Sequence, residues 1–187
     1  MGTIDIVTFL LSMLYILLAI RNNYLCFYVA IVQCTLWTYL DFFRYHLVFD
    51  GILQIFYIGM AVWGIILWHK KDENESNLPI TFLNKHQHYW TIIGGGILAM
   101  VLAYGSEFMM EAEMRYLDAF TTIISILATF MLIFRKVDTW LYFVLADALY
   151  IYIYIQAESI MLALVMVIYT VMAIIGYIKW KKMMLLS

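Results

Sequence analysis

Long apolar runs alternate with short polar stretches along the whole chain. Seven of these runs approach the roughly 20 residues that a helix needs to cross about 30 Å of hydrocarbon. They cover residues 4–20, 24–40, 51–68, 89–104, 119–134, 140–155 and 159–178. Strands are not expected, because an open sheet would leave backbone groups unpaired in lipid, and no run sustains the alternation of a barrel strand. The pattern therefore predicts an all-α integral membrane protein with seven transmembrane helices.

The composition supports a protein whose solvent is the lipid bilayer. Of the 187 residues, 66 % are hydrophobic and 13 % are charged, whereas a soluble domain is about half apolar and a quarter charged. The net charge is −2 and the basic residues form no long run, so no nucleic-acid partner is predicted. Cys26 and Cys34 would lie about 12 Å apart on one helix, which is too far for a disulfide.

Lysine and arginine indicate the orientation, because short loops rich in these residues stay on the cytoplasmic side. With seven spans the loops alternate between two faces, and all but two of the 11 basic residues fall on one of them. The other face carries Arg44 and Arg115, so the N-terminus is expected outside and the C-terminus in the cytoplasm. Acidic residues gather on or near this outer face, which predicts a vestibule that attracts cations; the alternative is that they have no role. They are Asp5, Asp41, Asp50, Glu107, Glu111, Glu113, Asp118 and Glu158.

The longest polar stretch separates the third apolar run from the fourth. It contains an acidic segment and the only proline, Pro79, and is interpreted as a cytoplasmic linker. His86 and His88 lie in it without the further ligands of a zinc site, so both are expected to be solvated. The spans contain no nucleotide-binding or hydrolase motif. The sequence therefore predicts neither an enzyme nor a cofactor, and transport by this chain alone would not be driven by ATP.

A faint internal repeat relates the two sides of this linker. The third run ends with Gly64 and Trp68, and the seventh ends with Gly176 and Trp180 at the same spacing, each pair being followed by lysines. The alternative is that tryptophan recurs by chance or as an interfacial anchor. The repeat predicts a 3+1+3 arrangement of two parallel three-helix repeats, in which substrate binds near the midplane between the repeats. The first repeat, the linker, the fourth helix with its outer loop, and the second repeat are placed at 1–68, 69–88, 89–116 and 117–187.

Helical spacing shows which side chains of a span share a face. In the sixth run Asp147 shares a face with several aromatic rings, and in the fifth run Ser125 shares a face with other hydroxyl groups. Such residues line cavities, but they also pack helices together. Asp147 stands out because a charge near the centre of a span costs about 2.5–3.5 kcal/mol on insertion scales. The predicted substrate-binding residues are Gln33, Trp37, Gln54, Tyr57, Ser125, Trp140, Phe143, Asp147 and Tyr150.

Two regions of the chain resemble the PnuC family of vitamin transporters. The stretch from Leu53 to Trp68 resembles the Leu-Gln-x-Phe … Tyr-Gly-Trp-x-x-Trp region of that family. The second half resembles it more closely, in the order and spacing of Asp118, Ser125, Arg135, Lys136, Trp140, Asp147, Gly176 and Trp180. The resemblance implies a three-one-three fold like that of the SWEET sugar carriers, a homotrimer and a location in the bacterial inner membrane. It also implies facilitated diffusion of an unphosphorylated vitamin that a cytoplasmic kinase then traps by phosphorylation.

Departures from the family pattern bear on the substrate. Nicotinamide riboside carriers of this family have Trp-x-x-Trp where this chain has Trp140 and Phe143, and asparagine at the position of Asp147. Trp63 and Ile65 also stand where the family has tyrosine and tryptophan. Losing tryptophans weakens a site for stacking nicotinamide, whereas a buried carboxylate suits thiamine, which has a fixed positive ring and an aminopyrimidine donor. The prediction is uptake of thiamine by alternating access; nicotinamide riboside, another small solute and a non-transporting membrane adaptor are the alternatives.

Overall fold

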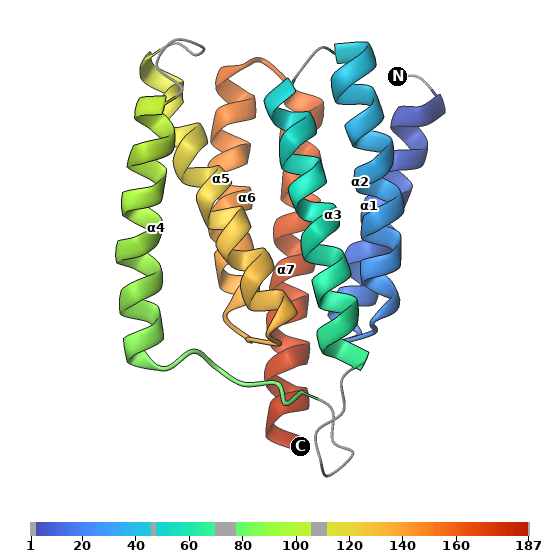
Figure 1. The fold of residues 1–187 in the computed structure, drawn as a ribbon, viewed down its shortest axis with the longest axis vertical. Helices are drawn as coiled ribbons and strands as arrows, with labels where there is room; N and C mark the ends of the chain where they lie inside the picture. The colour runs from blue at the N-terminus through green and yellow to red at the C-terminus, as the bar shows by residue number, and fades with distance from the viewer. Residues whose placement is uncertain (1–2, 46–47, 70–77, 106–111, 187) are drawn as a thin grey trace. The chain divides into compact units, whose positions relative to one another are not determined.

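The computed structural model describes residues 3–45, 48–69, 78–105 and 112–186, which are almost entirely helical (Figure 1). The elements are α1 (Thr3–Ile20), α2 (Leu25–Leu40), the π-helical turn η1 (Asp41–Tyr45), α3 (Val48–His69), α4 (Lys85–Gly105), α5 (Ala112–Ile133), α6 (Thr139–Gln156) and α7 (Ile160–Leu186). In the part of the chain that the structure describes, the β-type pairing is limited to a bridge between Thr81 and Lys136. The predicted all-α class is confirmed.

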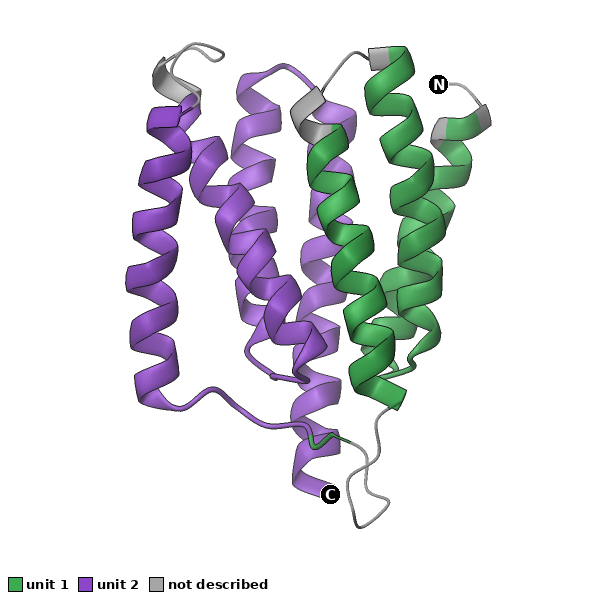
Figure 2. Ribbon diagram, in the orientation of Figure 1, with its two compact units in different colours: residues 1–79 green, residues 80–187 purple. Residues whose placement is uncertain are grey.

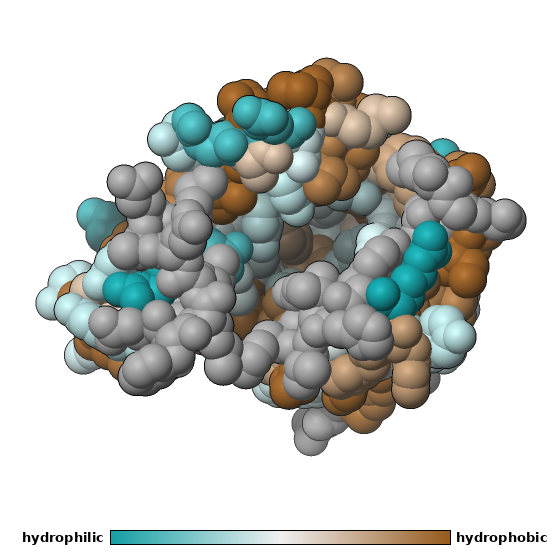
Figure 3. Space-filling model, turned by 90° about the horizontal axis from the view of Figure 1, so that it is seen from above, coloured by the Kyte–Doolittle hydropathy of each residue, from teal (hydrophilic) through white to brown (hydrophobic). Residues whose placement is uncertain are grey.

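Length and hydropathy make six helical stretches candidates for crossing a membrane, and a seventh, Ile6–Ile20, is apolar but shorter. Large hydrophobic side chains are exposed on all seven α-helices, and many residues in the end-on view of Figure 3 are brown, the colour of hydrophobic residues. A soluble monomer rarely exposes so much apolar surface. The surface is the one expected of helices that face lipid.

The chain forms two compact units, residues 1–79 and 80–187 (Figure 2). In the first unit α2 packs against both α1 and α3, and in the second unit α4, α5, α6 and α7 pack successively along the chain. The predicted division at 1–68, 69–88, 89–116 and 117–187 stays a prediction. Helix α4 begins at Lys85, inside the predicted linker, because Asn84 and Gln87 exchange side-chain to backbone hydrogen bonds of 2.9 and 2.7 Å. This reciprocal pair satisfies amide groups that a helix start leaves unpaired.

The same close helix contact occurs once in each unit. In the first, Gly64 of α3 lets the Phe27 ring of α2 approach so closely that a β-carbon at Gly64 would clash with it, and Phe27 meets Trp68 edge to face at 4.9 Å. In the second, Gly176 of α7 accommodates the Trp140 ring of α6 in the same way, and Trp140 meets Trp180 edge to face at 5.5 Å. The glycines recognised as a sequence repeat thus make equivalent contacts.

Helices α1 and α5 also share local geometry. Thr8 and Thr121 are fully buried, and the hydroxyl one turn later donates to the threonine carbonyl oxygen, from Ser12 at 2.9 Å and from Ser125 at 3.0 Å. Each helix ends two residues before a left-handed residue, Asn22 with φ 53° or Arg135 with φ 50°. These shared features support a duplicated three-helix motif within the chain.

Candidate functional site

A polar face on α5 and α6 carries most of the site residues predicted in the second unit. The Tyr150 side chain forms hydrogen bonds with Thr122 and Ser125 of α5, and Asp118 lies close enough to act on it electrostatically. The three α5 residues share one helical face. We call Asp118, Thr122, Ser125, Asp147 and Tyr150 the α5–α6 polar face.

The hydrogen bonds of this face have a direction. The Ser125 hydroxyl donates to the Thr121 carbonyl oxygen, so its oxygen remains free to accept a hydrogen bond from the Tyr150 hydroxyl. Thr129 donates in turn to the Ser125 carbonyl oxygen at 2.9 Å. The Tyr150 ring is also stacked on Tyr154, with centroids 5.8 Å apart and planes inclined by 16°. Tyr150 is therefore held from two sides, and Thr122 and Tyr154 are supporting residues that the predicted set omitted although their helical spacing placed them there.

Asp147 lies one helical turn before Tyr150 and is 9 % exposed. A carboxylate in this setting loses most of its hydration, which favours a bound cation or a hydrogen-bond donor beside it. Phe143, one turn earlier on the same helix, is half-buried. The arrangement offers a carboxylate, a hydroxyl chain and aromatic rings, which are groups suited to binding a polar cation by charge and cation–π contact.

Trp140 occupies a different environment from the other α6 residues of the predicted set. It is 1 % exposed and its ring lies against Gly176 and Trp180 of α7. Helical spacing put it on the stripe of Asp147, but the contact with α7 covers the ring. In this structure Trp140 packs α6 on α7, and its predicted part in substrate binding stays a prediction.

The predicted residues of the first unit are half-buried. They are Gln33 and Trp37 on α2, and Gln54 and Tyr57 on α3. Tyr15 of α1, which the sequence analysis did not single out, lies within electrostatic range of Cys34 and Tyr57. The first unit thus gathers polar groups from three helices, and whether they share a cavity with the second unit stays a prediction.

The predicted acidic vestibule is only partly within the described residues. Glu107 and Glu111 lie outside them, and nothing is described of the side chains of Asp5, Asp50 and Glu113. Of the remaining acids, Glu158 is exposed and Asp118 is half-buried. Asp41 is 4 % exposed, so it is a buried side chain and does not face an open vestibule.

The segment before α4 is fastened to the turn between α5 and α6. Thr81 exchanges backbone hydrogen bonds with Arg135 and Val137, at 3.1 and 2.9 Å. Asp138, 4 % exposed, accepts a hydrogen bond from the Leu83 amide at 2.6 Å and one from His88 Nε2 at 3.1 Å. His88, expected to be solvated, is half-buried and paired, because its partner Asp138 lies 50 residues away, where sequence spacing does not reveal it. We call Asp138 and its two partners, Leu83 and His88, the Asp138 clasp.

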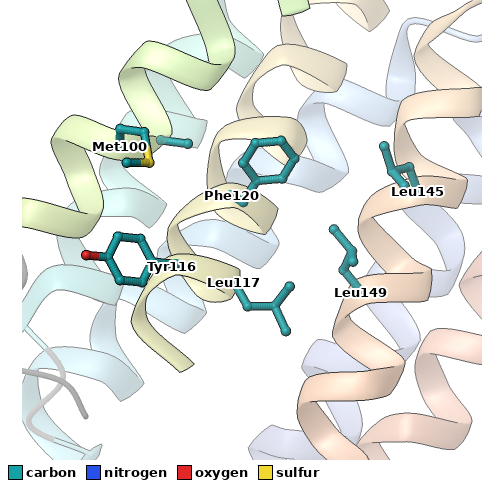
Figure 4. Close-up of a pocket in the computed structure, with 7 residues that line it drawn as sticks. Met100, Tyr116, Leu117, Phe120, Leu145 and Leu149 are labelled. Carbon is teal, nitrogen blue, oxygen red and sulfur yellow. The ribbon is translucent and has the colours of Figure 1, made fainter. Parts of the chain in front are cut away.

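A groove of about 490 Å³ lies apart from the α5–α6 polar face. Its lining comes from three helices and consists of Ala99, Met100, Tyr116, Leu117, Phe120, Leu145 and Leu149 (Figure 4). None of the predicted substrate-binding residues lines it. Among the described residues, no three histidine, cysteine or acidic side chains are grouped as metal ligands.

Comparison with known proteins places the whole chain among transporters. The chain has the fold of a solved structure described as "Crystal structure of the Vitamin B3 transporter PnuC", with a TM-score of 0.75 and 19 % sequence identity over 95 % of this chain and 80 % of that chain. No curated protein matches the chain. The family model described as "Nicotinamide mononucleotide transporter" matches residues 2–182. The predicted resemblance to PnuC and the prediction of a transporter instead of an enzyme are confirmed, and the chain belongs to this transporter family.

Proposed function

We propose that the chain carries an unphosphorylated cationic vitamin across the bacterial inner membrane by facilitated diffusion, with thiamine as the first candidate substrate. The observation that carries this proposal is Asp147, a carboxylate 9 % exposed within a membrane-spanning helix. A buried charge in a span is costly and is typical of a substrate pathway. Family membership supports vitamin transport in general.

The charge of the α5–α6 polar face favours a cation over an anion. Its two acids are Asp118 and Asp147, and none of its five residues is a lysine or arginine, although Arg115 stands one turn before Asp118 on α5. A mononucleotide would bring a phosphate, which the carboxylates of Asp118 and Asp147 would repel. Thiamine instead offers a fixed positive ring for Asp147 and the aromatic side chains.

Nicotinamide riboside is the second candidate, because it also carries a cationic ring and because the structural neighbour is described as a vitamin B3 transporter. Thiamine is preferred because Asp147 can accept from an aminopyrimidine group as well as face a positive ring. A neutral amide at this position would keep only the hydrogen bond. Substitution of Asp147 by asparagine therefore separates the two vitamins.

Alternating access between two parallel three-helix repeats is the proposed mechanism, with α4 as the connecting helix of a SWEET-like 3+1+3 arrangement. The equivalent contacts of Gly64 with Phe27 and of Gly176 with Trp140 support the duplication. Nothing in this mechanism uses ATP. A cytoplasmic kinase would make uptake one-way by phosphorylating the vitamin, and a homotrimer with its N-terminus outside is the proposed assembly.

Uptake into proteoliposomes tests this function. Vesicles with the purified chain are given labelled thiamine, nicotinamide riboside or nicotinamide mononucleotide, and empty vesicles are the control. Thiamine should equilibrate without ATP and the mononucleotide should stay outside. A thiamine kinase with ATP inside the vesicles should turn equilibration into accumulation. Flux no greater than in empty vesicles for all three compounds would instead support the adaptor alternative.

A further inference from the structure

The groove of Figure 4 has a polar end. Tyr116 is the lining residue with a hydroxyl group, and Arg115 donates a hydrogen bond from Nη2 to that hydroxyl at 3.4 Å. The Arg115 guanidinium also lies 5.0 Å from the centre of the Tyr116 ring. The rest of the lining is aliphatic, phenylalanine or methionine. A cation therefore adjoins one end of an otherwise apolar groove.

Arg115 retains unused hydrogen-bonding capacity. Its side chain is 8 % exposed, and its buried Nε atom has no hydrogen-bond partner. A buried guanidinium donor without an acceptor is costly, and among the described contacts the Tyr116 hydroxyl accepts from one of the five N–H groups of Arg115. An acceptor with several oxygens and negative charge would complete the site, because arginine binds phosphate with paired hydrogen bonds.

The polar end of the groove lies near the ends of two helices. Helix α4 ends at Gly105, and Arg115 and Tyr116 lie in the first turns of α5, which begins at Ala112. Tyr104 meets Tyr116 edge to face at 6.2 Å, and tyrosines at this level are typical of the boundary between hydrocarbon and headgroups. Leu145 and Leu149 of α6 supply apolar lining within the span. The groove thus has a headgroup-level cation and a hydrocarbon-level apolar lining.

We propose that this groove is a binding site for an anionic phospholipid, with an acyl chain along α4, α5 and α6 and the phosphate on Arg115. The order of chemistry along the groove matches the order within a lipid. Charge complementarity favours a lipid over the apolar face of a partner protein, since an apolar face would offer no acceptor to the Nε of Arg115. A free phosphate would satisfy Arg115 but would not need the apolar lining.

Native mass spectrometry of the detergent-purified protein, titrated with phosphatidylglycerol or phosphatidylcholine, tests the site. Leu145→Trp fills the groove, and Leu141→Trp is its matched control, since both leucines are about half exposed on α6 and only Leu145 lines the groove. Arg115→Gln removes the cation, and Arg44→Gln is the control on an exposed arginine of the other unit. Monodispersity and tryptophan fluorescence report whether each variant is folded.

We expect one phosphatidylglycerol to bind the wild type at least tenfold more tightly than phosphatidylcholine. Arg115→Gln should abolish this preference, Leu145→Trp should weaken both lipids, and the two controls should bind as the wild type does. Equal affinities of the wild type for the two lipids would overturn the proposal. An unchanged preference in Arg115→Gln, loss of binding on adding inorganic phosphate, or a change of oligomeric state in Leu145→Trp with lipid affinity intact would overturn it as well.

Discussion

Removing the Asp138 carboxylate should destabilise the second unit. Asp138→Ala deletes the acceptor of two hydrogen bonds, from the Leu83 amide at 2.6 Å and from His88 at 3.1 Å. A hydrogen bond to an ionised group contributes about 1.5–3 kcal/mol, and the His88 bond is discounted because that side chain is 36 % exposed. The expected loss in the free energy of unfolding is therefore about 3 kcal/mol. His88→Ala, which leaves the Leu83 bond intact, should cost about 1 kcal/mol.

Unfolding by denaturant in mixed micelles measures these losses. His86→Ala is the matched control, because this neighbouring histidine is exposed and, among the described residues, accepts a hydrogen bond from Trp90 of its own helix and meets its ring. Its cost should be below about 0.5 kcal/mol. Asp138→Asn should fall between Asp138→Ala and the wild type, since an amide oxygen still accepts from the Leu83 amide. If Asp138→Ala loses no more stability than His86→Ala, the clasp does not hold the segment before α4.

Three further changes test packing, orientation and the site. Gly176→Ala should lower the free energy of unfolding by about 1–3 kcal/mol, since its β-carbon would lie 2.5 Å from the buried ring of Trp140. Gly59→Ala, where a β-carbon would have no atom within 4 Å, should be neutral or stabilising. Equal effects of the two variants in denaturant unfolding would contradict the packing argument. A cysteine replacing exposed Glu158 should react with an impermeant thiol reagent in intact cells and one replacing exposed Lys182 only after lysis; the reverse pattern would invert the orientation. Tyr150→Phe should weaken thiamine binding about threefold to tenfold in calorimetry, because the ring loses its hydroxyl hydrogen bonds to α5. Unchanged affinity would show that the hydrogen bonds of the Tyr150 hydroxyl do not contribute to thiamine binding.

The sequence predicted the helices well because hydrocarbon imposes a length and a composition on them. The start of α4 was misplaced although its signal was present, since Asn84 and Gln87 stand at the spacing of a reciprocal helix cap. The change from the α-helix that ends at Leu40 to the π-helical turn that begins at Asp41 has no comparable signal in the sequence. The sequence revealed Gly64 and Gly176 as equivalent positions, because a close helix contact requires a residue without a side chain.

Contacts between distant residues set the limit of prediction for the site. The bond of Asp138 to His88 joins α4 to the residue just before α6, and no periodicity reveals such a partner. Helical spacing places Asp147 and Tyr150 on one face of α6, but it does not say which neighbour covers each residue. Trp140 lies on that stripe and packs on α7, whereas Tyr150 bonds to α5.

The most direct test of the proposed substrate site is a calorimetric titration of Asp147→Asn with thiamine and with nicotinamide riboside. The substitution keeps the shape of a side chain that is 9 % exposed and removes its charge. Losing one member of a buried, hydrogen-bonded charged pair costs about 2–5 kcal/mol, so thiamine should bind the variant at least about 30-fold more weakly while nicotinamide riboside binds as well or better. Thiamine affinity equal to that of the wild type would show that Asp147 does not contact the vitamin and would contradict thiamine as the substrate this site selects.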